Sequence, residues 1–248
     1  NKLMTLDMLA NFEWKRPIYL TQVYILQDFG LMDYLQFDGY AYRLVPIRTK
    51  VESAWEVGRI DPDYAAPLLR DTFRYGNLND PKVYVDHFTQ YNLSAAQTRS
   101  SFARVAKALL AEERVAEAEE LLDLGLERLP ITQIRFTDAN TYPFLEAYYA
   151  AAALGSPTAN EKGDALMRAY FHNLVEYIEY YLLFDGVQGV MVDKELSDRL
   201  DELEEVYFLA SYARRYDLVR EMNDYYRTLG VEEEHLLKVP DAPTPVDK

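Results

Sequence analysis

The sequence predicts a mainly α-helical protein, an array of helical hairpins stacked into a short α-α superhelix, preceded by a small α+β segment with two short strands. Three observations support this fold class. Apolar residues recur at helical spacing over most of the chain after residue 92. Small residues occur where paired helices would approach each other. Two β-prone runs, each containing a proline, lie near the amino terminus.

The clearest hairpin runs from Arg99 to Pro130, with its turn expected at 112–115. Small or aromatic residues stand at its packing positions and a proline follows it: Phe102, Ala106, Ala118, Gly125 and Pro130. Small side chains let two antiparallel helices approach closely. The spacing partly matches the tetratricopeptide pattern of roughly 34 residues. We therefore expect tetratricopeptide-like repeats.

Four later segments continue the helical pattern. They are 142–154, 161–184, 194–214 and 217–229, with Gly155 and Gly230 as stop signals. Paired in order, they predict a second and a third hairpin. The helical repeats are thus expected to occupy residues 92–237, and the proline-containing tail 238–248 is expected to be disordered.

Residues 1–91 form the expected α+β segment, packed on the helical array. A short helix is predicted at 3–11, strands at about 17–22 and 40–47, and a turn at Asp38–Gly39. The stretch 24–35 fits either a helix or a loop. Glycines and prolines interrupt 51–91, where one helix, 66–75, is expected to start at Pro67.

Composition excludes several functions. A net charge of −15 disfavours nucleic acid and anionic lipid as partners, because both need a basic surface. Without cysteine there is no disulfide, zinc-thiolate site or thiol catalysis. No apolar run approaches the roughly 20 residues of a membrane-spanning helix. Because the chain opens with Asn1, we expect it to be a piece of a longer protein.

No cofactor, metal or catalytic residue is predicted. His87, His172 and His235 lie far apart and lack partners at ligand spacing. Acidic runs such as Glu117–Glu120 and Asp201–Glu205 are expected to form solvated helix faces. The glycine-containing stretch 184–189 lacks the full pattern of a phosphate-binding loop and is expected to be a connection. The sequon at 92–94 is not expected to carry a glycan.

Tyrosine is unusually frequent, with 21 residues, many on predicted helices. A tyrosine combines an apolar ring with a polar hydroxyl, so it suits both helix packing and a binding groove. Packing is the default interpretation. The alternative is a concave surface for a partner, and its candidate residues are Tyr148, Tyr149, Tyr177, Tyr181, Tyr212 and Tyr216.

Specific phrases near the amino terminus suggest a family. They are Asp7, Asn11, Trp14 with 16–19 (Arg-Pro-Ile-Tyr), and Gly39 with 41–47 (Ala-Tyr-Arg-Leu-Val-Pro-Ile), followed by the hairpin 92–123. These resemble the soluble carboxy-terminal region of a family of large bacterial membrane proteins of unknown function. The multi-pass part of that family is similar to protein O-mannosyltransferases, which use a lipid-linked sugar donor.

This resemblance implies a non-catalytic accessory domain on the periplasmic side of the inner membrane, as the soluble tail of a multi-pass protein. Its expected partners are another protein or its own membrane domain, with acceptor polypeptide and glycan as further candidates. The acidic catalytic residues of the family belong to the membrane part, so none is assigned here. One alternative is a tetratricopeptide-like scaffold unrelated to glycosylation. Another is a carbohydrate-active enzyme using Asp61 and Asp63.

Overall fold

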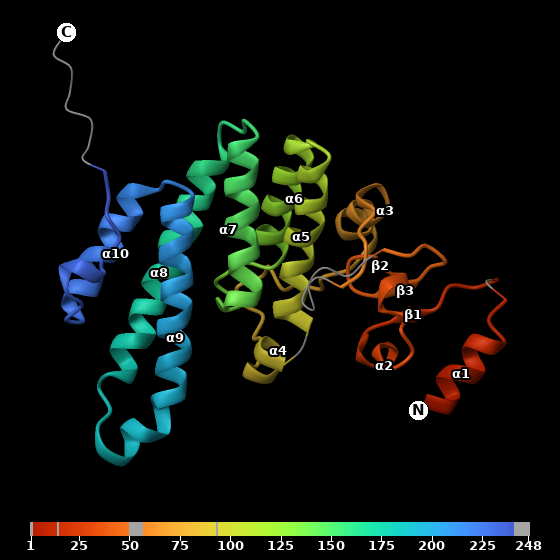
Figure 1. Ribbon diagram of the computed structural model, residues 1–248, viewed down its shortest axis with the longest axis horizontal. Coiled ribbons are helices and arrows are strands. Elements are labelled where there is room, and N and C mark those ends of the chain that lie inside the picture. The colour runs from red at the N-terminus through yellow and green to blue at the C-terminus, as the bar shows by residue number, and fades with distance from the viewer. Residues whose placement is uncertain (1, 14, 50–56, 93, 241–248) are drawn as a thin grey trace, which may run out of the picture. The chain divides into compact units, whose positions relative to one another are not determined.

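The computed structural model describes residues 2–13, 15–49, 57–92 and 94–240 (Figure 1). Over these residues the protein is mainly helical with one small antiparallel sheet, which confirms the predicted fold class. The chain divides into two compact units, 1–135 and 136–248. The hairpin predicted at 99–130 lies within the first of these units.

The first unit begins with short elements and ends with the first long hairpin. Its elements are α1 (Lys2–Ala10), β1 (Tyr19–Leu20), α2 (Tyr24–Gln27), a 3₁₀ turn (Met32–Tyr34), β2 (Leu35–Phe37), β3 (Tyr42–Leu44), α3 (Pro62–Pro67), a π-helical turn (Leu68–Thr72), α4 (His87–Asn92), α5 (Ser94–Ala111) and α6 (Val115–Arg128). Trp14, the middle of the sequon and residues 50–56, on which some of the predictions fall, lie outside the described residues.

The sheet has three strands in the order β1-β3-β2, where two were predicted. Tyr19 pairs with Arg43 and Leu35 pairs with Leu44, so β3 is bonded along both edges. The missed strand is β2. All three of its residues are buried, so it shows no polar-apolar alternation by which a half-exposed strand is recognised. The predicted turn at Asp38–Gly39 is confirmed, with Gly39 at a φ of +94°.

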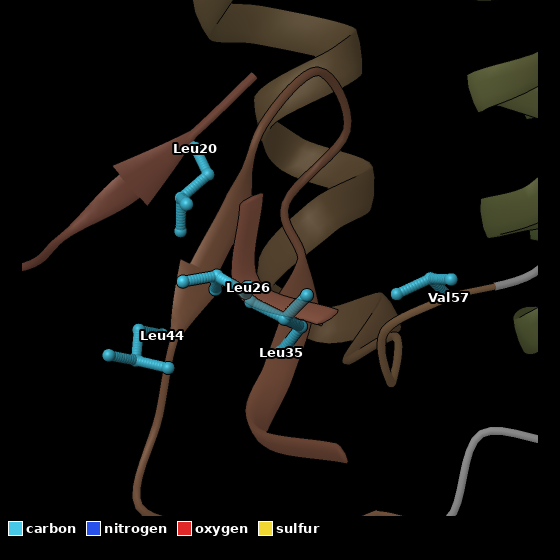
Figure 2. Packing of buried hydrophobic residues seen from close by; sticks show 5 residues of the cluster. All are labelled: Leu20, Leu26, Leu35, Leu44 and Val57. Carbon is cyan, nitrogen blue, oxygen red and sulfur yellow. The ribbon is translucent and has the colours of Figure 1, made fainter. Parts of the chain in front are cut away.

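Five buried side chains form a core around this sheet: Leu20, Leu26, Leu35, Leu44 and Val57 (Figure 2). Each strand contributes one leucine, α2 contributes another, and Val57 arrives from the segment that follows β3. Leu35 is fully buried. The sheet is therefore held by a small apolar cluster as well as by its short ladders.

Helix α3 begins earlier than predicted. Pro62, and not Pro67, occupies the first turn, where the missing N–H of a proline has no helical partner to lose. Pro67 is the last residue of α3, and the chain continues into the π-helical turn instead of extending as one helix to residue 75.

The predicted hairpin is confirmed as α5 and α6, joined by the turn 112–114. Ala106 and Ala118 are fully buried, and Gly125 is buried too, as expected for positions of close helix approach. Arg99 is also buried. Its Nε donates to the carbonyl of Leu129 at 3.1 Å and its Nη2 to the carbonyl of Ile134 at 2.6 Å, so it holds the exit of α6 against α5.

One arginine of α5 connects the hairpin to the sheet. Arg104 donates to the carbonyl of Val57 at 2.8 Å and to the Tyr42 hydroxyl at 3.1 Å. Its guanidinium lies 4.0 Å from the ring centroid of Phe37. These contacts explain why the first hairpin belongs to the amino-terminal unit.

The second unit consists of helices α7 (Asp138–Ala153), α8 (Ala159–Tyr181), α9 (Gly186–Tyr212) and α10 (Tyr216–Thr228), followed by a 3₁₀ turn (Glu233–His235). α7 packs on α8, α8 on α9 and α9 on α10. α7 starts four residues before the predicted Tyr142, and at its first turn the backbone N–H of Thr137 donates to Asn140 Oδ1 at 3.2 Å. Of the predicted tail, 241–248 lie outside the described residues.

Helix α9 also starts earlier than predicted, at Gly186 instead of Lys194. Two glycines within four residues argued for a connection, but the backbone N–H of Gly189 bonds the carbonyl of Asp185 at 3.0 Å and closes a helical turn. The connection from α8 therefore shrinks to 182–185. Among the helices described, none combines the length and apolar character needed to cross a bilayer.

Candidate interaction surface

The connected ends of α8 and α9 expose an unusual concentration of apolar side chains. Six residues are between 54% and 80% exposed: Tyr180, Leu182, Leu183, Val187, Val190 and Met191. We call these six residues the apolar tip. Large contiguous apolar exposure is uncommon on the surface of a soluble protein and usually marks an interaction site.

The tip exists because α8 and α9 continue past the core that they share. The last buried residue of α8 is Ile178, and the first buried residue of α9 is Glu202. Figure 1 shows the connected ends of these two helices extending beyond α7 and α10 in the same unit. The side chains of the tip are therefore exposed to solvent, whereas the corresponding faces elsewhere on α8 and α9 pack against other helices of the unit.

Aromatic contacts hold the α8 side of the tip. Tyr177 and Tyr181 stack with ring centroids 6.1 Å apart, and the Tyr180 ring meets Phe184 edge-on at 5.2 Å. Such pairs add to the stability gained from area burial alone. The structure thus brings two of the six predicted surface tyrosines together beside the tip.

The other four predicted tyrosines lie elsewhere in the second unit. Tyr148 and Tyr149 are buried, so they pack α7 on α8 instead of facing solvent. The Tyr149 hydroxyl bonds Asp164 Oδ1 at 3.1 Å, and Arg215 Nε donates to the same oxygen at 2.7 Å. Tyr212, at the end of α9, is 89% exposed, and Tyr216, at the start of α10, is partly exposed.

Acidic residues border the apolar tip. Between residues 176 and 198 the chain carries six carboxylates and a single lysine: Glu176, Glu179, Asp185, Asp193, Glu195 and Asp198, with Lys194. The Lys194 ammonium lies 2.7 Å from Asp198 Oδ2. The surroundings of the tip are therefore electrostatically negative.

A buried carboxylate lies further along α9. Glu202 accepts a hydrogen bond from the Tyr170 hydroxyl of α8 and is paired with Arg199 at 2.8 Å. Phe136 stacks on Tyr170 with centroids 5.3 Å apart. Burial raises the pKa of Glu202 to about 7. This group can therefore take up a proton near neutral pH, and its partners are all protein side chains.

The burial of Glu202 corrects the prediction that Asp201–Glu205 forms a solvated face. The same correction applies to Glu119 on α6, which is 9% exposed. Glu202 precedes the buried Val206 by four residues and so lies on the buried stripe of α9. This four-residue spacing from an apolar residue was the feature of the sequence from which the burial of Glu202 could have been predicted.

A pocket lies between α10 and the segment that follows it. This pocket of about 400 Å³ is lined by nine residues, among them Arg220, Asn223 and Leu236. Its arginines are engaged, since Arg227 Nε lies 2.6 Å from Glu233 and Arg220 Nη1 lies 2.6 Å from Asp217. Both arginines are thus paired with carboxylates, and the lining also contains Lys238.

The remaining polar candidates are not among the residues of the tip. Asp63 Oδ1 accepts a hydrogen bond from Arg114 Nη1 at 2.6 Å, which connects α3 to the turn between α5 and α6. Glu232, Glu234 and His235 are exposed neighbours whose ligand atoms lie within 4.8 Å of one another. His172 Nε2 lies 3.4 Å from Glu221. Exposed acidic groups of this kind are common without a metal, so we assign none.

Comparison with known protein families gives a match at the amino terminus. Residues 1–64 match the family model described as TMEM260-associated domain 2. The matched segment contains the three-stranded sheet and the phrases at 16–19 and 41–47. It covers about a quarter of the chain. No curated protein and no solved structure matches the sequence.

Proposed function

We propose that this chain is a non-catalytic interaction domain of a membrane-embedded protein O-glycosyltransferase-like protein, lying on the periplasmic side of the inner membrane. Its role is to bind a partner protein, an acceptor polypeptide or its own membrane domain. The match of residues 1–64 to a TMEM260-associated domain supports the membrane-protein connection. The resemblance of the phrases at 16–19 and 41–47 to a glycosyltransferase-like family supplies the link to glycosylation.

The observation that carries the interaction role is the apolar tip. Its six side chains stay exposed although, on α8, the buried core ends at Ile178, only two residues before the tip begins at Tyr180. Keeping apolar area in water forgoes roughly 25 cal/mol per Å². A surface of this kind gains that stabilisation when a partner covers it.

The test replaces the tip in the intact gene product. The variant Leu183→Ser/Val187→Ser/Val190→Ser, called the tip variant, removes three exposed apolar side chains without touching the core. A matched control, Tyr24→Ser/Tyr84→Ser/Phe88→Ser, removes three exposed aromatic side chains that belong neither to the tip nor to the predicted tyrosine surface. Mass spectrometry of O-linked glycans in cells should show a loss for the tip variant and native levels for the control.

A stand-alone helical scaffold unrelated to glycosylation is the second candidate, favoured by the paired helices and the tip alone. It predicts native glycan levels in the tip variant, together with loss of some other partner-dependent property. Sugar transfer or hydrolysis by the isolated chain would contradict both candidates. Replacing Asp61 and Asp63 with Ala would show whether they carry such an activity.

A further inference from the structure

We propose that the apolar tip docks a protein segment that presents an apolar stripe flanked by lysine and arginine side chains, as an amphipathic basic helix does. This inference rests on the proposed function, because it names the chemistry of the partner for the same surface. It commits to a polypeptide and to a positive charge on that polypeptide.

The apolar part of the argument comes from side-chain spacing. Val187, Val190 and Met191 occur at i, i+3 and i+4 on α9 and are 74% to 80% exposed. Residues at this spacing share one helix face. Helical partners commonly bind by laying such an i, i+3, i+4 stripe against another apolar surface. The first turns of α9 therefore already have the surface of a helix that packs against another helix.

Charge decides which polypeptide fits. Six carboxylates and one lysine lie between residues 176 and 198, and that lysine is paired with Asp198. Like charges brought together at an interface cost free energy, whereas opposite charges favour encounter and correct register. A partner with lysine or arginine beside its apolar stripe is complementary to this border.

The same charges argue against two other occupants. A second copy of the chain would bring its own acidic border against this one, in a protein whose net charge is −15. An anionic lipid surface would repel the carboxylates in the same way. An uncharged lipid bilayer could bury the apolar side chains but would make no favourable interaction with the acidic border. Binding to uncharged lipid vesicles is therefore measured as a competing outcome.

The probe is a fluorescent, helix-forming peptide of about 18 residues with a leucine stripe flanked by lysines. A second peptide keeps the stripe and replaces each lysine with glutamate. We expect the lysine peptide to bind the native chain in fluorescence anisotropy, and to bind the tip variant at least about tenfold more weakly. The glutamate peptide should not bind. Added salt should weaken the lysine complex, because rim charges are screened.

A second pair of variants tests the charge of the partner separately from its apolar contacts. Asp193→Asn/Glu195→Gln removes two carboxylates from the border, and Glu232→Gln/Glu234→Gln removes two exposed carboxylates outside the tip. Only the first pair should weaken binding of the lysine peptide, by a few fold. All variants change exposed side chains, and circular dichroism of each should match the native chain.

Four results would overturn the inference. They are equal affinity of the lysine peptide for the tip variant, equal binding of the two peptides, tip-dependent binding of the chain to phosphatidylcholine vesicles, and a dimer in sedimentation that the tip variant abolishes. If these appear while the tip variant still loses glycans in cells, the interaction role stands and only the partner chemistry fails. If glycan levels are native while the lysine peptide binds through the tip, the scaffold alternative holds.

Discussion

The α5–α6 and α8–α9 hairpins are both antiparallel helix pairs, but the first buries its apolar side chains and the second exposes several of them at its turn. In α5–α6 the inward side chains Val105, Leu109 and Leu121 are fully buried, and the turn consists of charged residues. In α8–α9 the first three of the four turn residues, 182–184, are apolar, and Leu183 is 78% exposed. The charged turn is anchored by Arg114, which pairs with Asp63 at 2.6 Å and with Glu117 at 2.8 Å.

This difference separates residues that fold the chain from residues that are free to bind. A hairpin can close with a polar turn, as α5–α6 does, so folding does not require the apolar turn of α8–α9. Uncovered apolar side chains also carry a risk of aggregation. Their presence on α8–α9 is best explained by a partner, and the predictions below test whether the two hairpins differ in this way.

The largest expected effect is on a leucine that the first hairpin buries completely. Leu109→Ala removes buried methyl groups and leaves a cavity, so the free energy of unfolding should fall by about 4 kcal/mol. The matched change in the second hairpin, Leu183→Ala, should cost less than about 0.5 kcal/mol because that side chain already contacts solvent. Urea denaturation of both variants measures the two changes in the free energy of unfolding. Equal losses of stability would contradict the proposed difference between the two hairpins.

The next effect concerns the buried arginine of the first hairpin. Arg99→Ala leaves the carbonyls of Leu129 and Ile134 without the guanidinium donor, at a cost of about 3 kcal/mol. Glu127→Ala, an exposed change near the end of α6, is the control and should stay within about 0.5 kcal/mol of the native chain. Similar thermal midpoints for the two variants would contradict the role given to Arg99.

A smaller effect depends on pH and lies where the α8–α9 hairpin is still covered. Because burial raises the pKa of Glu202 from 4.5 to about 7, the folded chain keeps a proton that the unfolded chain has lost between these values. Stability from this group is therefore present below about pH 4.5 and is lost as pH rises towards 7. Relative to Glu202→Gln, the native free energy of unfolding should fall by up to about 3 kcal/mol from pH 4.5 to pH 8. A constant difference between the two proteins across this range would contradict the burial of the carboxylate.

The smallest effect on stability is expected at the tip itself. Val190→Ser should change the free energy of unfolding by less than about 0.5 kcal/mol, since the side chain is 78% exposed. Solubility should rise, because less apolar surface faces water. A loss of several kcal/mol in urea denaturation would show that the tip is part of the core.

Sequence patterns predicted much of the fold because four of its longer helices, α5, α6, α8 and α10, are amphipathic. The turn at 112–114, the buried Ala106 and Ala118 and the helix stop at Gly230 all follow local rules. Strand β2 was missed because a fully buried strand lacks alternation. The start of α9 was missed because glycines outweighed the spacing of its apolar residues.

The candidate surface was harder to predict than the fold. Tyr148 and Tyr181 look alike in the sequence, but Tyr148 is buried between helices and Tyr181 lies beside the tip. A helix end extends past its neighbours only if its helix is longer than the helices beside it. This depends on the lengths of several helices at once, so no local sequence pattern predicts it. The apolar run Leu182-Leu183-Phe184 at the end of a predicted helix was the one available signal.

The central claim is that the apolar tip is uncovered, and methionine oxidation tests it most directly. Met191 in the tip is 74% exposed, whereas Met167 and Met222 in the same unit are fully buried. Under mild hydrogen peroxide, peptide mass spectrometry should show Met191 converted to the sulfoxide well before the other two. Met191 oxidising as slowly as Met167 would mean that another surface already covers the tip, and would contradict this account.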